Sequence, residues 1–186
     1  FVSDRRVQKN EYFLDQGVEL KGKNLGIIGL GSIGSAMAEL AKGIGMRVIA
    51  YNRSPKKMKG VEMVTLDKIL KESDAISLHT THEEANNNMI GKTQLAKMKK
   101  GVIIVNTVDR ELVDEEAMAQ ALKSGKVDTY VYEGEDLIHT PLAKLENAIG
   151  FKAFAWYTKE ALDNLYRIRI SNLVALAKGN PQNRVV

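Results

Sequence analysis

Short apolar runs alternate along the chain with polar or amphipathic stretches. The runs are centred near residues 27, 48, 62, 76 and 103, with stretches of helical character between most of them. This alternation predicts parallel strands joined by right-handed helical crossovers. The runs near 27, 76 and 103 are almost continuously apolar, as in strands covered on both faces. We therefore predict an α/β fold: a Rossmann-type doubly wound parallel sheet in a three-layer α/β/α arrangement.

Turn and capping residues set the expected bounds of the elements. Further strands are expected at 46–51, 61–64, 75–79, 102–105, 127–132 and 148–151, the strand at 127–132 being half-exposed and near the sheet edge. Helices are expected from residue 35 to Gly43 or Gly45 and at 66–70, 93–98, 114–123, 141–145 and 158–178. Asp114 precedes two glutamates and is expected to cap its helix, which Ser124 and Gly125 end. The last helix, a long one, carries an apolar stripe and ends at Gly179 and Pro181.

The organisation along the 186 residues is expected to be simple. A lead-in helix or arm occupies 1–24, the dinucleotide-binding domain 25–152 and a C-terminal helical segment 153–186. The net charge of +4 comes from basic residues interleaved with acids, which argues against a nucleic-acid partner. No apolar run is long enough to span a membrane, and the absence of cysteine excludes disulfides and thiol nucleophiles. We expect a cytoplasmic protein without membrane partners.

A glycine-rich turn follows the first strand. The apolar run from Leu25 ends in Gly29-Leu-Gly31-Ser32-Ile33-Gly34, and a helical pattern begins there. In a strand–turn–helix unit of this type the first glycine permits the tight turn and the second leaves room for a pyrophosphate. The third lets the helix pack against the strand. The phosphates are expected at the free N–H groups of the helix N-terminus, beside Ser32 and Ile33.

The residues after the second strand select the nucleotide. Asn52 occupies the position, about twenty residues past the glycines, where an NAD enzyme places a carboxylate for the ribose hydroxyls. Arg53, Ser54 and two lysines follow, and these suit the 2′-phosphate of NADP. We therefore predict NADP in preference to NAD. The alternative is that Arg53 and the lysines form a solvated basic turn.

Taken in order, the motifs resemble the cofactor domain of the D-isomer-specific 2-hydroxyacid dehydrogenases. The resemblance runs from about Leu20 to the end of the chain, through the segments 20–34, 45–51, 66–79, 98–107, 112–126, 132–135, 141–142 and 157–161. It implies a nicotinamide dinucleotide as cofactor, with His79 and Thr107 beside it, and a homodimer formed through this domain. It also implies a substrate-facing lobe built mostly from residues before the cofactor domain, which this chain is expected to lack. The last helix would then lose much of its usual partner.

The chain departs from the family at the catalytic positions. Asp109 stands where the family keeps the arginine that clamps the substrate carboxylate, and Arg110, one residue later, is expected to point elsewhere. Lys152 and Ala153 stand where the family has Pro-His, so its acid/base histidine is missing. Glu135 retains the supporting carboxylate, the one catalytic position carried over.

Other reactive side chains have ordinary alternatives. His79, His82 and His139 are not expected to hold a metal, because 79 and 82 fall on a strand end and a loop. His82 is a relocated base or an exposed loop histidine. Lys152 is a desolvated amine, or its aromatic neighbours form core or an exposed patch. Asp109, with Arg110 and Glu111, reads most simply as a solvated charge cluster.

Three functions remain open from the sequence. The first is a nucleotide-binding module that is catalytically silent as this chain. The second is an active reductase of glyoxylate, hydroxypyruvate or a similar 2-oxo acid, seen as a fragment. The third is a scaffold whose altered cleft rim serves self-association or a partner, suggested by the four aromatic residues at 151, 154, 156 and 157.

Overall fold

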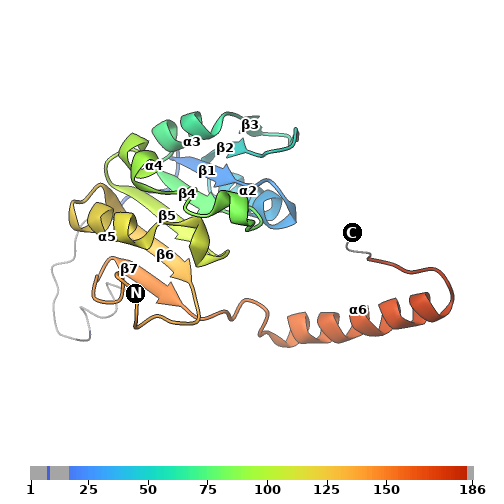
Figure 1. Ribbon diagram of the computed structural model, residues 1–186. Coiled ribbons are helices and arrows are strands. Elements are labelled where there is room, and N and C mark those ends of the chain that lie inside the picture. Colours follow the sequence, from blue (N-terminus) through green and yellow to red (C-terminus); the bar gives the residue numbers. More distant parts are fainter. Residues whose placement is uncertain (1–7, 9–16, 184–186) are drawn as a thin grey trace.

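A seven-stranded sheet forms the centre of the molecule (Figure 1). The computed structural model describes Gln8 and residues 17–183, so the arm predicted over 1–24 lies mostly outside the described residues. The strand order is β3-β2-β1-β4-β5-β6-β7, and every neighbouring pair is parallel. This confirms the doubly wound parallel sheet.

The observed elements lie close to the predicted ones. The strands are β1 (Asn24–Ile28), β2 (Arg47–Tyr51), β3 (Val61–Met63), β4 (Ala75–Leu78), β5 (Val102–Asn106), β6 (Val127–Glu133) and β7 (Ala148–Phe151). The α-helices are α2 (Ser32–Gly43), α3 (Leu66–Glu72), α4 (Lys92–Lys97), α5 (Glu115–Lys123) and α6 (Lys159–Ala177). Asp114 caps α5 as predicted, its side chain accepting a hydrogen bond from the Ala117 N–H.

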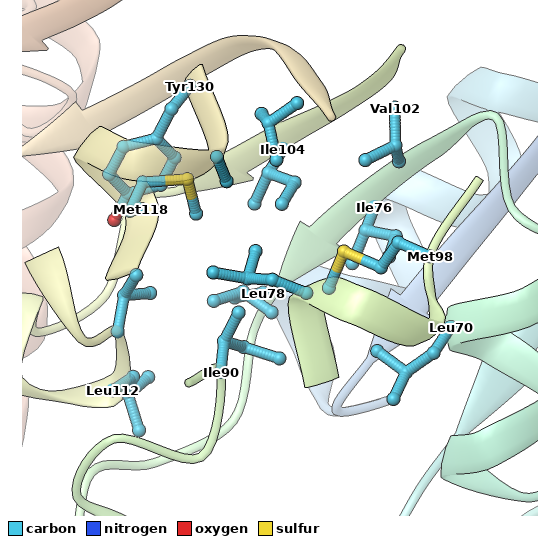
Figure 2. Close-up of a cluster of buried hydrophobic side chains, with 14 of the residues drawn as sticks. Leu70, Ile76, Leu78, Ile90, Met98, Val102, Ile104, Leu112, Met118 and Tyr130 are labelled. Carbon is cyan, nitrogen blue, oxygen red and sulfur yellow. The ribbon is translucent and has the colours of Figure 1, made fainter. Parts of the chain in front are cut away.

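Alternate side chains of the central strands enter two different cores. Helix α2 packs on β1 and β2 over a small cluster that includes Leu25, Ile27 and Val48. The opposite face, with α3, α4 and α5, holds the larger cluster, in which Leu78, Ile90 and Ile104 meet (Figure 2). Because Ile27 and Ile28 fall in different clusters, β1 is covered on both faces, which explains its continuous apolar run.

One local prediction is corrected by the structure, and two short 3₁₀ helices add to the predicted elements. Residues 141–145 form hydrogen-bonded turns instead of a helix, with the Ala143 N–H donating to the Thr140 carbonyl and the Leu145 N–H to that of Leu142. The loop 80–88 contains a short 3₁₀ helix, η1 (Glu84–Asn86), and a second one, η2 (Arg110–Leu112), follows β5. Pro141 at the start of this segment imitates a helix start, but the segment is too short to propagate a helix.

Helix α6 projects away from the sheet (Figure 1). It begins where predicted, because the Thr158 hydroxyl accepts a hydrogen bond from the Ala161 N–H. The expected stripe is exposed: Tyr166, Leu173 and Leu176 are each about 60% or more accessible. The helix thus presents an apolar surface with little cover from the described residues. None of the helices in the described part of the chain has the length and apolar character needed to cross a membrane.

Candidate functional site

The strand order reverses between β1 and β4, which run side by side although two strands separate them in sequence. In open α/β sheets the ligand crevice lies at such a reversal, outside the carboxyl ends of the strands. A cleft of about 480 Å³ lies there. Its lining includes Gly29 and Gly31 after β1, Asn52 and Arg53 after β2, and His79 with Thr80, Thr81 and Glu83 after β4.

The three glycines have three different surroundings. Gly29 has φ +99°, and a Cβ on it would lie 2.6 Å from the backbone of His79 and Thr80. A Cβ on Gly34 would lie 2.1 Å from the Gly29 carbonyl oxygen. Gly31 has nothing within 4 Å of its Cβ position. Gly29 and Gly34 therefore serve the fold, whereas Gly31 leaves open space where a ligand can approach.

The first turn of α2 faces this space without a side-chain cap. Gly31 is the N-cap residue, and no side chain accepts from the first N–H groups in the described part of the chain. Ser32 and Ile33 are exposed there, Ile33 to 72%. Unpaired N–H groups at the positive end of a helix form an anion site. The geometry fits the pyrophosphate position predicted from the glycine pattern.

Asn52 braces the turn. Its Oδ1 accepts a hydrogen bond from the Leu30 N–H at 2.9 Å, and its Nδ2 donates to the Ser54 carbonyl at 2.8 Å. Lys56 adds a second link, with Nζ donating to the Leu30 carbonyl at 2.7 Å. These bonds fix the glycine turn to the end of β2. Both polar atoms of the Asn52 amide are therefore bound to the backbone of the chain.

Arg53 pairs across the cleft. Its Nη1 and Nη2 donate to the two carboxylate oxygens of Glu83 at 2.9 and 3.1 Å. The pair lowers the pKa of Glu83 and raises that of Arg53, in each case chiefly through this hydrogen bonding, so both groups are charged at neutral pH. Arg53 is thus not merely a solvated basic side chain: it links the β2 and β4 sides of the cleft.

His79 lines the cleft directly after β4. Its Nε2 lies 2.9 Å from Oγ of Ser77, a buried residue. Burial lowers the pKa of the His79 imidazole, so the neutral ring is favoured in the folded chain.

This shift predicts a loss of stability in acid. Because the folded chain disfavours the charged ring, the unfolded chain binds more protons below the ordinary histidine pKa of about 6.5. Stability linked to His79 is therefore present above that pH and falls as the pH drops toward the lower folded value. We expect the urea midpoint to fall less between about pH 7 and pH 5 in His79→Gln than in the unsubstituted chain. Equal slopes in the two proteins would contradict the assignment.

A second cleft, of about 420 Å³, lies at the ends of β5, β6 and β7. Five of its nine lining residues are acidic: Asp109, Glu111, Glu133, Glu135 and Asp136. Backbone N–H groups of His139 and Ile138 bind the Asp136 carboxylate and lower its pKa to about 2. Ala153 also lines this cleft and supplies no proton donor. The carboxylates give the cleft a negative potential.

Arg110 is held by neighbours at the edge of this cleft. Its Nε and Nη2 donate to Glu115 at 2.6 and 2.7 Å, and its Nη1 donates to the Asp136 carbonyl at 2.5 Å. The guanidinium also lies 5.7 Å from the Tyr132 ring centroid. All three of its nitrogens are engaged, which agrees with the expectation that Arg110 does not replace the missing clamp.

Asn106 positions Asp109. The Asn106 side chain is fully buried, accepts from the Val108 N–H and donates to the Asp109 carbonyl and the Tyr130 hydroxyl. The carboxylate of Asp109 lies 3.4 Å from His82 Nδ1, and Glu111 completes a set whose ligand atoms are within 4.8 Å of one another. Exposed clusters of this kind are common without an ion, and we propose no metal here. His79 and His139 are not part of this set.

Several predicted residues lie apart from the first cleft. Thr107 is exposed directly after β5 and does not line it, whereas Ser54 does. Glu135 is exposed in the acidic cleft. Lys152 is exposed, so it is not a desolvated amine; Phe154, Trp156 and Tyr157 beside it are also exposed, to more than half. The aromatic residues thus form a surface patch.

Two partners were missed from the sequence. Glu83 falls in a polar loop, and only the meeting of the β2 and β4 ends at one sheet edge would have paired it with Arg53. Glu115 looked like an acidic residue placed for the positive end of α5, and its bond to Arg110 is an additional role.

The sheet, the glycine turn and the cleft define a Rossmann-type dinucleotide-binding domain. The sequence model of the "D-isomer specific 2-hydroxyacid dehydrogenase, NAD binding domain" matches residues 2–151. The chain therefore belongs to the D-isomer-specific 2-hydroxyacid dehydrogenase family, which confirms the resemblance.

Related proteins are similar over nearly the whole chain. A glyoxylate reductase of Thermococcus litoralis is 40% identical over 177 residues, covering 91% of this chain and 54% of that protein. A D-3-phosphoglycerate dehydrogenase of Archaeoglobus fulgidus is 37% identical over 194 residues, covering 99% of this chain and 37% of that protein. An acyclic imino acid reductase solved with NADPH and D-Arg superposes with TM-score 0.93 at 27% identity, covering 100% of this chain and 62% of that one. The chain thus spans 37–62% of the length of these relatives.

Proposed function

We propose that this chain binds a nicotinamide dinucleotide in the first cleft, with NADP preferred over NAD. The observation that carries the preference is the charge beside the β2 end. Position 52 offers a neutral amide, and Arg53, Lys56 and Lys57 follow it. A 2′-phosphate gains charge-assisted hydrogen bonds from such groups, whereas NAD lacks the phosphate. Structural relatives include proteins solved with NADPH and with NAD⁺, so the relatives support either dinucleotide and the proposed preference rests on these side chains.

Fluorescence titration tests this proposal. NADPH and NADH are added to the chain, and quenching of Trp156 or enhancement of nicotinamide emission is followed to saturation. We expect saturable binding of both, with the lower dissociation constant for NADPH. If neither NADPH nor NADH gave a saturable signal, the binding site would be refuted. Tighter binding of NADH than of NADPH would refute the preference.

An aspartate at position 52 is expected to invert the preference. In Asn52→Asp one carboxylate oxygen still accepts from the Leu30 N–H, and the other, which can no longer donate to the Ser54 carbonyl, becomes available to the ribose hydroxyls. The same charge repels a 2′-phosphate, so we expect NADPH binding to weaken roughly tenfold while NADH binding is kept or improved. Asn180→Asp, an exposed change of equal charge beyond α6, is the control. An unchanged NADPH-to-NADH ratio would contradict a role of this position in cofactor choice.

We further propose that the chain does not carry out 2-oxo acid reduction by itself. The acidic cleft supports this, because five carboxylates repel an anionic substrate and Arg110 is bound to Glu115. Ala153 offers no acid for the carbonyl oxygen. The test is NADPH oxidation with glyoxylate or hydroxypyruvate, expected at the background rate.

The alternative is an active reductase of which this chain is one part. Glyoxylate and hydroxypyruvate reductases among the relatives favour it. A longer protein containing this chain would then oxidise NADPH with those acids, and turnover by the chain alone would contradict catalytic silence.

We also propose that the chain forms a homodimer, with the aromatic surface patch or α6 in the contact. Light scattering over a dilution series tests this, and a constant monomer mass would exclude it.

A further inference from the structure

We propose that Glu83 is a specificity-determining residue of the cofactor cleft, which competes with the 2′-phosphate of NADP for the Arg53 guanidinium. The proposal rests on the proposed dinucleotide site and deepens it. Glu83 weakens the binding of NADP and so limits the preference for it, because its carboxylate pairs with the Arg53 guanidinium that the 2′-phosphate would otherwise bind.

The contact between the two side chains is the fork-to-fork arrangement that a phosphate would also use. Two guanidinium nitrogens of Arg53 each donate to a different oxygen of Glu83, at 2.9 and 3.1 Å. An arginine so paired cannot give the same two donors to a phosphate until the carboxylate leaves. Both residues line the cleft, from the β2 side and the β4 side, so the exchange takes place at the ligand.

The loop around Glu83 is closed upon itself. The Asn86 Oδ1 accepts from the Glu83 N–H at 2.8 Å, and the Asn86 Nδ2 donates to the Thr81 carbonyl at 2.8 Å. The Asn86 side chain therefore fixes the backbone at Thr81 and at Glu83. This bracing holds the Glu83 Cα in place, so the carboxylate is presented to the cleft when Arg53 is released and repels an incoming phosphate as well.

Two other polar side chains near the β2 end, Asn52 and Lys56, are already bound to the backbone. The Asn52 amide uses both its atoms on Leu30 and Ser54, and Lys56 reaches the Leu30 carbonyl. Arg53, by contrast, is bonded to a side chain that can rotate away. Its side chain is 78% exposed and that of Glu83 45%, so the ion pair is the weak, solvent-screened kind that a multiply charged phosphate can displace. NAD carries a hydroxyl in place of the 2′-phosphate, so its binding does not require the Arg53 guanidinium.

A double-mutant cycle on the whole chain tests the competition, with NADPH and NADH as probes. We expect Glu83→Gln to tighten NADPH binding roughly three- to tenfold, because a weak ion pair and a like-charge repulsion are removed. NADH binding is expected to change less than about twofold, since its ribose does not compete for Arg53. In an Arg53→Gln background the Glu83 substitution should have little effect on NADPH. Glu84→Gln, the exposed neighbour, removes an equal charge and is the matched control.

Four outcomes would overturn the proposal. An unchanged NADPH affinity in Glu83→Gln would show that Glu83 does not compete with the phosphate. An equal gain in affinity for NADPH and NADH would show that the ion pair hinders both dinucleotides alike. A gain that persists without Arg53, or that Glu84→Gln matches, would reduce the effect to general charge. Failure of the unsubstituted chain to bind either dinucleotide would refute the site itself, a result distinct from binding without discrimination by Glu83.

Discussion

Replacement of Gly34 by alanine is expected to destabilise the domain by about 3 kcal/mol, the upper end of the usual cost of inserting an extra methyl group into a packed core. The new Cβ would lie 2.1 Å from the Gly29 carbonyl oxygen and 3.3 Å from a methyl of Ile27. The first of these is backbone and cannot rotate away. Gly29 itself is fixed, at φ +99° and with its N–H bonded to the Tyr51 carbonyl at 2.9 Å. The clash must separate α2 from β1, which opens the smaller core.

Urea unfolding followed by circular dichroism measures this loss as a lower midpoint at unchanged slope. Gly43→Ala is the control, because Gly43 lies in the same helix and a Cβ there has nothing within 4 Å. That change should leave stability unchanged or raise it by about 0.5–1 kcal/mol, through helix propensity. Comparable midpoints for the two variants would show that Gly34 does not hold the turn.

The glycine turn was predictable because its sequence pattern is short and local, although one of the contacts that require it comes from His79 and Thr80. A positive φ and two backbone approaches each demand glycine at a fixed position within six residues, so the sequence pattern carries the geometry. The strands were predictable for a similar reason: residues adjacent in the chain, such as Ile27 and Ile28, must both be apolar when both faces are covered. Neither inference requires knowing in advance which distant segment makes the contact.

The occupancy of polar side chains was not predictable in this way. Asn52 was interpreted as a nucleotide contact, yet its amide binds Leu30, twenty-two positions away in the chain. Arg53 finds Glu83 thirty positions away, at the point where two loops meet. Hydrophobic periodicity fixes which loops meet but leaves open which of their charged residues pair. The cleft could therefore be located from the sequence, whereas its internal bonds required coordinates.

Helix α6 illustrates a different limit. Its cap and its end follow from Thr158 and Gly179, and both lie where expected. Its apolar stripe is of the kind that normally faces a core, and the family resemblance implied that this helix would lose much of its usual partner. In the described chain only Ala175 is buried there. A hydrophobic stripe shows that a surface is suited to cover, and it does not identify what covers it.

Substitution of Gly31 by aspartate is expected to abolish dinucleotide binding while the domain stays folded. Gly31 has φ −77° and ψ −161°, a conformation open to any residue, and no atom lies within 4 Å of its Cβ position. It is also the N-cap of α2, where aspartate is among the preferred residues. The free energy of unfolding should therefore stay the same or rise slightly. The pyrophosphate, however, would meet a side chain and a negative charge at the N–H groups it needs.

We expect the dissociation constants of NADPH and NADH to rise together, roughly 100-fold or more, because the lost phosphate contacts are common to both. Fluorescence titration gives the affinities, and urea midpoints confirm the fold. Gly17→Asp, an exposed glycine with nothing within 4 Å, carries the same charge outside the cleft and should bind as the unsubstituted chain does. Retained affinity in Gly31→Asp would place the phosphates elsewhere. Loss of both affinity and stability would instead make Gly31 a residue of the fold, like Gly29 and Gly34, and would remove the distinction on which the assignment of this turn to a ligand depends.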